Sequence, residues 1–434
     1  MKCIKLTISR ARQIAVEAQF LNRNRDTCTG KEDILRIIDQ LGYVQIDTIS
    51  IINRSHHHTL WTRNPHYDET MLHELQAGDR AVFEYWGHAM SYLPMHDYRF
   101  NIRRMRNFEN PSSPWAVMQF EKCRHLLKDV LKRIREEGPL CSRDFKPAKK
   151  GGTWWDWKPA KVALEMLLWR GDLMVTGRKN FQKVYDLTER VLPPHIDIRP
   201  PDDEELGRFI VGRAIRAFGV AGLKEMMNYL QPASSRDSDF RLAGRDVIEK
   251  AVHNMLESRE IIPVRLENHS GCYYVSSKTL ENRTDSKSAA PVLLHLLSPF
   301  DNLIIQRERT RHLFDFDYSL ECYIAPSRRR YGYFVLPVLW GDTLAGRLDP
   351  KADRKTETMI IHNLVLEPEA VPPDVLIPAL AKKLAEFSVF NGCKKIEIIR
   401  AVPDSVKKKL VKQSVCHMSS GKHHEKPQGT GQRL

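Results

Sequence analysis

Residues 163–174 read ALEMLLWRGDLM, and residues 251–262, which lie 88 positions later, read AVHNMLESREII. In both stretches the apolar residues recur at i, i+1, i+4 and i+5, which is the stripe of one amphipathic helix. Further along, residues 185–188 match residues 273–276 at the same offset, and turn-forming residues at 177–180 and 267–271 precede them. The repeat therefore predicts a helix followed by a β-hairpin in each copy.

More helix precedes each copy, at 120–137 in the first and at 205–218 and 223–230 in the second. Three helices followed by a hairpin are typical of the winged helix, which commonly lays one helix in a DNA groove. A fainter third copy is predicted nearer the N-terminus, with a helix at 71–76 and a hairpin formed by 81–85 and 89–93. Winged helices also serve as protein-interaction modules, so the repeat alone leaves DNA binding open.

The chain beyond residue 290 changes in character, because extended runs at 332–339 and 359–366 are rich in β-forming residues. A helix at 375–390 and a strand at 395–400 are predicted to follow. We therefore expect an α+β fold of three tandem winged-helix units and a β-rich C-terminal domain. The expected bounds are 1–112, 113–200 and 201–288 for the units, 289–411 for the C-terminal domain, and 412–434 for a disordered tail.

The 434 residues carry a formal net charge of +14, from 68 Lys and Arg against 54 Asp and Glu. Such a charge favours a polyanionic partner, either nucleic acid or an anionic membrane surface, although a basic protein without such a partner is the alternative. We expect no signal peptide and no membrane span, since the N-terminus is interrupted by charge and no apolar run is long enough. The eight cysteines are scattered, which predicts reduced thiols and a cytoplasmic location.

A candidate catalytic pair follows the helix predicted at 31–41, which ends at Gly42. If 43–48 is a strand, alternation turns Val44 and Ile46 toward the core and sets Gln45 and Asp47 together on the other face. An amide and a carboxylate side by side could hold one water molecule. The alternative is an ordinary half-exposed strand with polar residues outside, since such alternation is common.

Residues 52–65 combine cations, imidazoles and an indole, a mixture that contacts phosphates and stacks on bases. Three consecutive histidines cannot all face one metal ion from one helix or strand, so we expect no metal site here. The alternative is a helix with a polar face and a buried structural histidine. The candidate DNA-binding residues are Arg54, His56, His57, His58, Trp61 and Arg63.

Residues 42–50 (GYVQIDTIS) and 56–61 (HHHTLW) resemble the YcaQ-type (AlkX/AlkZ-like) winged-helix DNA glycosylases. Further matching motifs occur at 297–303, 307–309, 314–318, 331–339 and 347–355. The resemblance extends from about Ile8 to Lys409, and the Gln-x-Asp form of the catalytic motif is one of the two found in the family. The tail is the part that the resemblance does not cover.

The resemblance implies hydrolysis of the N-glycosidic bond of N7-alkylated purines, unhooking of interstrand crosslinks, and an abasic product. Double-stranded DNA carrying such lesions would be the partner of a monomeric enzyme that needs no cofactor or metal. Because an N7-alkylated base is cationic, it leaves without a strong general acid. Asp47 would act as general base and electrostatic stabiliser, and Gln45 would position the water.

A crosslinked purine stays tethered to the opposite strand and cannot enter a closed base-flipping pocket. We therefore expect the catalytic residues on an exposed strand edge, flanked by basic residues.

Two other functions are open on the residues alone. A non-enzymatic winged-helix regulator would need no Gln45 and Asp47 pair, and a metal nuclease would use Asp315, Asp317 and Glu321, which could instead be a structural polar cluster.

Overall fold

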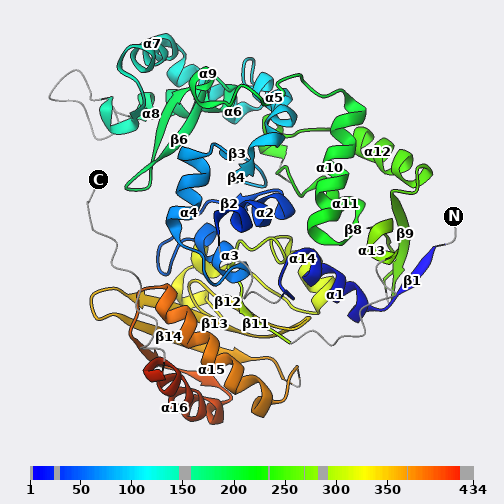
Figure 1. Cartoon of the computed structure of the whole chain (residues 1–434), viewed down its shortest axis with the longest axis vertical. Helices are drawn as coiled ribbons and strands as arrows, with labels where there is room; N and C mark the ends of the chain where they lie inside the picture. The colour runs from blue at the N-terminus through cyan, green and yellow to red at the C-terminus, as the bar shows by residue number, and fades with distance from the viewer. Residues whose placement is uncertain are drawn as a thin grey trace. The chain divides into compact units, whose positions relative to one another are not determined.

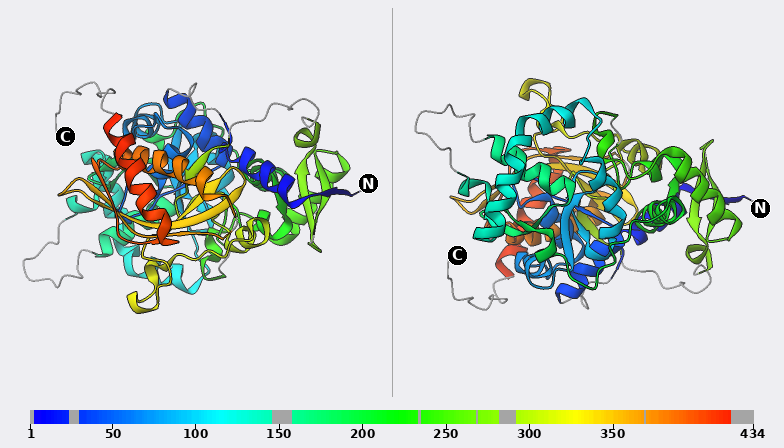
Figure 2. Two further views of the ribbon diagram at one scale, coloured as in Figure 1. Left: turned by 90° about the horizontal axis from the view of Figure 1, so that it is seen from below. Right: turned by 90° about the horizontal axis from the view of Figure 1, so that it is seen from above.

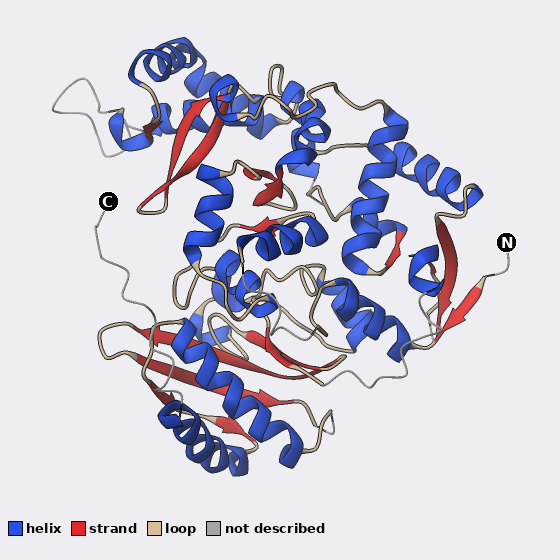
Figure 3. Cartoon of the chain, in the orientation of Figure 1, coloured by secondary structure: helices blue, strands red, loops and turns tan. Residues whose placement is uncertain are grey.

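The computed structural model describes residues 3–23, 30–145, 158–232, 235–267, 269–281, 292–368 and 370–420. The chain divides into two compact units (Figure 1). The first comprises Met1–Ile46 and Thr59–Ala290, and the second comprises Asp47–His58 and Pro291–Leu434. Both units mix helices and strands, so the fold class is α+β as expected (Figure 3). The boundaries expected at 112 and 200 within the first unit stay predictions.

The first unit repeats one order of elements three times: a helix, a short strand, further helix and a hairpin. The first set is α2 (Lys31–Leu41), β2 (Val44–Gln45), α3 (Ser55–Arg63), α4 (Glu69–His73), β3 (Val82–Trp86) and β4 (Met90–Pro94). The second is α7 (Leu127–Glu137), β5 (Leu140–Cys141), α8 (Lys158–Arg170), β6 (Leu173–Lys179) and β7 (Gln182–Leu187). The third is α10 (Asp203–Phe218), β8 (Val220–Gly222), α11 (Leu223–Met227), α12 (Arg245–Glu257), β9 (Ile261–Leu266) and β10 (Cys272–Ser276). The helix α3 spans the division, since only its last five residues belong to the first unit.

The sheets of these three sets have the same connectivity. In each, the second strand of the hairpin also pairs with the short upstream strand, giving the orders β2-β4-β3, β5-β7-β6 and β8-β10-β9. The strand β1 (Ile4–Leu6) adds to the third sheet by pairing in parallel with β9. The hairpins predicted after both copies of the repeat are confirmed, and they begin at Leu173 and Ile261, which are 88 residues apart.

The helices α5 (Tyr98–Asn107), α6 (Pro114–Cys123) and α9 (Thr188–Val191) connect the sets. The helix α1 (Ile8–Ala18) precedes the first set, and α13 (Ser277–Glu281) follows the third. The single helix predicted at 120–137 is wrong, because a 3-10 turn at Arg124–Leu126 separates α6 from α7. Ser113 begins α6 by accepting a hydrogen bond from the Ala116 backbone amide, which places the start of this helix earlier than the apolar pattern indicated.

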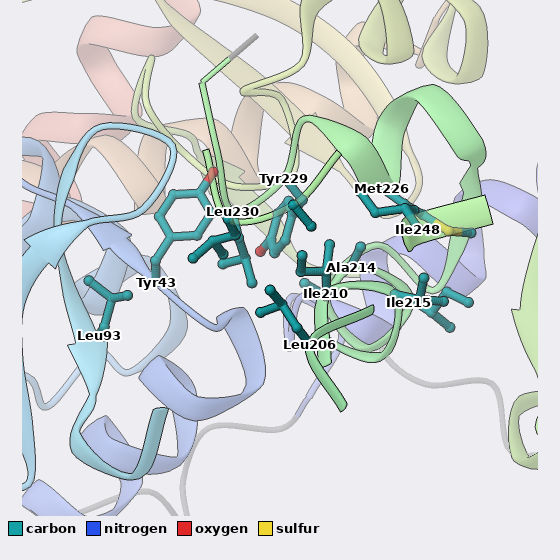
Figure 4. Close-up of a cluster of buried hydrophobic side chains, with 14 of the residues drawn as sticks. Tyr43, Leu93, Leu206, Ile210, Ala214, Ile215, Met226, Tyr229, Leu230 and Ile248 are labelled. Atoms are coloured by element: carbon teal, nitrogen blue, oxygen red, sulfur yellow. The ribbon is translucent and has the colours of Figure 1, made fainter. Parts of the chain in front are cut away.

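The repeated apolar stripes supply two buried clusters of the first unit. Ala163, Leu164 and Leu167 on α8 are fully buried, and Ala251 and Val252 on α12 occupy the equivalent positions in the other cluster. The second of these clusters also takes in Tyr43, just before β2, whose ring lies 5.1 Å from the ring of Tyr229 (Figure 4). The residues that lead into the candidate catalytic pair are therefore anchored in the core of the first unit.

The second unit is built on one sheet with the order β11-β12-β13-β14-β15, and β16 also pairs with β14. Its strands are β11 (Leu294–Leu296), β12 (Leu336–Trp340), β13 (Thr343–Asp353), β14 (Thr358–Leu366), β15 (Lys395–Ile398) and β16 (Ala401–Val402). Its helices are α14 (Arg307–Phe314), α15 (Pro373–Phe390) and α16 (Asp404–Ser420), and the last two lie side by side (Figure 1). Residues 332–335 precede β12 instead of belonging to it, because the Tyr333 and Phe334 backbone amides donate to the Asp349 carboxylate.

The disordered tail expected from residue 412 is wrong for its first part, since α16 runs to Ser420. Val406 and Leu410 are buried and give this helix an apolar side, while lysines occupy most of the positions between them. Residues 421–434 lie outside the described residues. Among the described helices, none combines the length and apolar character needed to cross a membrane.

Candidate active site

Gln45 is positioned by a short but firmly anchored strand. The helix α2 ends at Gly42, whose φ of 71° is the left-handed conformation predicted for this stop. The chain then enters β2, where Val44 pairs with Tyr92 and Gln45 with Ser91. The Tyr229 hydroxyl donates to the Leu41 carbonyl, which fixes the turn from the other side. Gln45 is half-buried, and its Oε1 atom is buried with no hydrogen-bond partner among the described residues.

Asp47 lies outside this strand, so the expected strand face shared by Gln45 and Asp47 is wrong. The last contact of the ladder is the bond from the Ile46 amide to the Met90 carbonyl, at 2.9 Å. The partner strand β4 begins at Met90, where the hairpin turns, and nothing remains beyond it for Asp47 to pair with. The exposed edge expected for the motif is also wrong for Asp47, which is only 7% exposed.

The segment Asp47–His58 belongs to the second unit and is held there by hydrogen bonds. Its middle lies along the end of β13, since the Ala352 amide donates to the Ile51 carbonyl (2.9 Å) and Arg354 donates to the Ser50 carbonyl (2.9 Å). The Asn53 side chain donates to the Phe390 carbonyl, and the Asn53 backbone amide donates to Asn391 Oδ1 at 2.7 Å. Gln45 therefore belongs to the first unit and Asp47 to the second.

The Asp47 carboxyl group is held between opposing influences. Burial raises its pKa, while the backbone amides of Ile49 and Thr48 and the charge of Arg54 favour the ionised form, and burial is the stronger effect. Its Oδ2 atom is buried and has no hydrogen-bond partner among the described residues. A carboxylate with a raised pKa and one uncommitted oxygen is suited to accept a proton from water.

The side chains predicted to contact DNA separate into two groups. Four are buried, namely His56, His58, Trp61 and Arg63, with exposed fractions of 5% or less. Arg54 and His57 are half-buried. The structure brings Arg54 near Asp47, as their electrostatic interaction shows.

Hydrogen bonds account for the burial of two of these side chains. His58 Nε2 lies 2.9 Å from the Leu296 carbonyl. Arg63 donates to the Gln19 carbonyl and to Gln19 Oε1, each at 2.8 Å, and to the Thr59 carbonyl at 3.1 Å. This arrangement supports the structural alternative for the buried histidine and for Arg63, because their polar atoms are committed to the interior.

The acidic residues of the rival metal site do not gather on a strand. Asp315 follows α14 with a φ of 51°, and Asp317 pairs with Arg311 at 2.9 Å. Glu321 is buried and accepts hydrogen bonds from the backbone amides of Arg330, Tyr331 and Gly332 at 2.8 to 3.0 Å. Among the described residues, no group of three or more His, Cys, Asp and Glu side chains is arranged to hold a metal ion.

Sequence reasoning missed two residues that interact electrostatically with Asp47. The pKa values of Cys322 and Tyr323 are both raised, mainly by desolvation, and the charge of Asp47 adds to the shift of each. Tyr323 is 81% exposed. The signal available in the sequence was the run of arginines and tyrosines at 328–333, which begins five positions after Tyr323.

The fold is similar to that of a DNA glycosylase of known structure. The DNA glycosylase AlkZ of Streptomyces sahachiroi is similar to this chain with a TM-score of 0.61 and 13% sequence identity. The match covers 92% of this chain and 100% of that chain. At this identity the likeness concerns the fold.

A family model described as "DNA glycosylase AlkZ-like" matches residues 38–390. The chain therefore belongs to the AlkZ-like DNA glycosylase family, and the resemblance found in its motifs is confirmed. It is a DNA glycosylase that acts in DNA repair. This membership excludes the non-enzymatic winged-helix regulator, which was one of the functions that the residues alone left open.

Proposed function

We propose that this glycosylase hydrolyses the N-glycosidic bond of N7-alkylated purines, with Asp47 as general base and electrostatic stabiliser and Gln45 as the group that orients water. The main observation in support is a pair of buried oxygens, Asp47 Oδ2 and Gln45 Oε1, which have no hydrogen-bond partner among the described residues. They lie two positions apart in the chain, so their Cα atoms are at most about 7 Å apart. We propose that the two side chains hold one water molecule, which would bridge the two oxygens.

The reaction needs little from the protein on the side of the leaving group. Alkylation at N7 makes the purine cationic, so the C1′–N9 bond breaks with its electron pair moving to the base, which leaves neutral. Positive charge then develops on the sugar, and the Asp47 carboxylate opposes it across a site with little water. Water forms the new bond to C1′ and gives its proton to Asp47, which leaves an abasic strand intact.

Interstrand crosslinks joined through purine N7 atoms belong to the same chemical class, and we propose them as further substrates. Each linked base carries the same positive charge as a singly alkylated purine, so the same bond is weakened. Support comes from the motif resemblance and from this shared chemistry. Unhooking releases one strand, because cleavage at one sugar is enough to separate the tethered partners.

The test is a single-turnover assay in EDTA with duplex DNA that contains N7-methylguanine, followed by alkali to reveal abasic sites. We expect base release without strand cleavage before alkali, and the same result with a crosslinked duplex. Release that requires Mg²⁺, or strand cleavage without alkali, would contradict the proposal. A chain that excises N7-methylguanine but leaves the crosslink intact would restrict the substrate to single lesions.

A further inference from the structure

A loop of the second unit combines an exposed aromatic ring with uncompensated positive charge. The loop, residues 322–333, lies between α14 and β12 and contains the 3-10 turn Pro326–Arg328. Figure 2 shows it in yellow, extending away from the strands of its own unit. At 81%, Tyr323 is the most exposed large hydrophobic residue among those described, whereas an aromatic ring normally gains stability from burial.

Three consecutive arginines on this loop are available to a polyanion. Arg328 and Arg330 are exposed and Arg329 is half-buried, and none of the three forms an ion pair with a described residue. Arg329 and Arg330 lie over the rings of Tyr333 and Tyr331, with 5.0 Å and 4.9 Å from guanidinium carbon to ring centroid. Stacked guanidinium groups keep their in-plane N–H donors free for phosphate oxygens.

The loop is held in one conformation from inside. Glu321 is 4% exposed and its carboxylate collects the three backbone amides of 330–332, while Arg329 Nε donates to the Ile324 carbonyl at 2.9 Å. Gly332 has a φ of 151°, and a Cβ there would lie 2.2 Å from Asp349 Oδ2, so only glycine fits. The exposed ring and cations are thus presented on a rigid support, which lowers the entropic cost of binding.

The loop and the Asp47 segment are anchored to the same end of one strand. Asp349 on β13 accepts the amides of residues 333 and 334, and Ala352, three residues further along β13, binds the Ile51 carbonyl. Three residues of strand span about 10 Å. The charge of Asp47 reaches Tyr323, which agrees with this placement.

We propose that the loop 322–333 is a DNA-binding element, in which Tyr323 stacks on a base beside the lesion and Arg328 and Arg330 bind the flanking phosphates. This inference rests on the proposed function for the position of the lesion at Asp47. The Tyr323 ring can stack on any of the four bases, because every base has a π-face. The arginines add binding affinity that decreases as the salt concentration rises. Tyr323 would fill space next to the attacked nucleotide and hold the opened stack.

The experiment uses the full chain and a duplex that carries a tetrahydrofuran abasic-site analogue next to 2-aminopurine, whose fluorescence reports base stacking. We expect wild-type protein and Tyr323→Phe to change the fluorescence on binding, and Tyr323→Ala to leave it unchanged and to bind about tenfold more weakly. The double variant Arg328→Ala/Arg330→Ala should lower the slope of log K against log salt by about 1.8. Its matched control is Lys408→Ala/Lys412→Ala on α16, which removes two exposed charges from the same unit and should keep the wild-type slope.

Wild-type fluorescence and affinity in Tyr323→Ala, together with a salt slope equal to that of the control in the arginine variant, would overturn the inference. Thermal melting of each variant checks the fold, which these exposed side chains should leave intact. Excision of N7-methylguanine is measured separately. If the wild-type chain excises the base while the loop variants bind normally, only the loop proposal is lost; if excision is absent while the loop variants bind poorly, only the proposed substrate is lost.

Discussion

At the scale of single residues, Asp47 carries a stability cost that its proposed catalytic role would explain. Its pKa is raised by burial, so at any pH above that pKa the folded protein holds an ionised carboxylate in an unfavourable place. The backbone amides of Thr48 and Ile49 and the charge of Arg54 offset only part of this cost. Groups that are strained in this way concentrate at functional sites, because the same desolvation strengthens their action on a developing charge.

Replacement of Asp47 by Asn should therefore separate activity from stability. We expect Asp47→Asn to lower the single-turnover rate of N7-methylguanine excision by on the order of a hundredfold or more, because base and electrostatic stabiliser are both lost. The melting temperature at neutral pH should not fall, since a neutral amide removes the cost of the buried charge. Asp374→Asn, which changes an exposed carboxylate of the same unit, is the control. Excision by Asp47→Asn at a near-native rate would contradict the proposed mechanism.

The pH dependence of excision should report the same carboxyl group. Ionised Asp47 is the active form, so the rate should fall as the pH falls through a pKa above the ordinary aspartate value of about 3.9. Arg54→Ala removes a charge that favours the ionised form, and the acid limb should then move to higher pH. Single-turnover excision rates of wild type and Arg54→Ala across the acid range, corrected for spontaneous base loss, measure the position of the acid limb in each protein. An acid limb that stays in place in Arg54→Ala would show that Arg54 does not act on the base.

Arg63 should behave as a structural residue and not as a phosphate contact. Its guanidinium group makes three buried hydrogen bonds to Gln19 and Thr59, and their loss leaves acceptors of Gln19 without partners. Arg63→Ala should lower the free energy of unfolding by about 3 kcal/mol. The salt slope of DNA binding by the folded variant should match wild type. Denaturant unfolding measures the first effect, with the exposed Arg245→Ala, expected within about 0.5 kcal/mol of wild type, as control. If Arg63→Ala is as stable as wild type but has a flatter salt slope, Arg63 contacts a DNA phosphate and is not a structural residue.

At the scale of elements, the winged-helix sets differ most where the catalytic motif lies. In the third set α11 follows β8 at once, and in the second set a 3-10 turn at Ser142–Asp144 follows β5. In the first set, residues 46–54 lie between β2 and α3. From Asp47 onward they belong to the second unit, where Ala352 and Arg354 donate to the Ile51 and Ser50 carbonyls. A repeated scaffold thus supplies a fixed point at Gln45, and a local departure from the repeat carries the carboxylate.

At the scale of the whole molecule, the catalytic motif depends on residues more than 300 positions away in the chain. Asn53 and Asn391 lie 338 residues apart in sequence and share a hydrogen bond from the Asn53 amide to Asn391 Oδ1. The side chain of Asn391 also donates to the Phe387 carbonyl at the end of α15. The segment that carries Asp47 is therefore held by residues from the end of the long helix α15.

Asn53→Ala and Asn391→Ala should consequently be coupled. We expect each to destabilise the protein by about 1 to 2 kcal/mol, and the double variant to lose less than the sum, because both disturb one network. Each should also slow excision, since Asp47 lies on the same segment. Chemical denaturation and single-turnover excision of the four proteins in the cycle give both values. Strict additivity would mean that the two asparagines act independently.

Much of the fold was predictable because it depends on local periodicity. The apolar spacing at 163–168 and 251–256 specified two helices, and the turn residues after them specified two hairpins that the structure contains. The identity of the family was also readable, since motifs such as 42–50 and 331–339 are long. These features are contained in short stretches of chain, where spacing and side-chain type decide the conformation.

Contacts between distant segments decided the rest. Alternation predicted that Gln45 and Asp47 share a strand face, but a strand lasts only as long as its partner, and β4 begins at Met90. The sequence of 52–65 showed cations and imidazoles and could not show which of them are buried, because Gln19 and Leu296 are far away in the chain. The placement of Tyr323 beside Asp47 has the same origin. Composition and spacing determine which groups are present, and only long-range packing determines which of them face water, each other or the substrate.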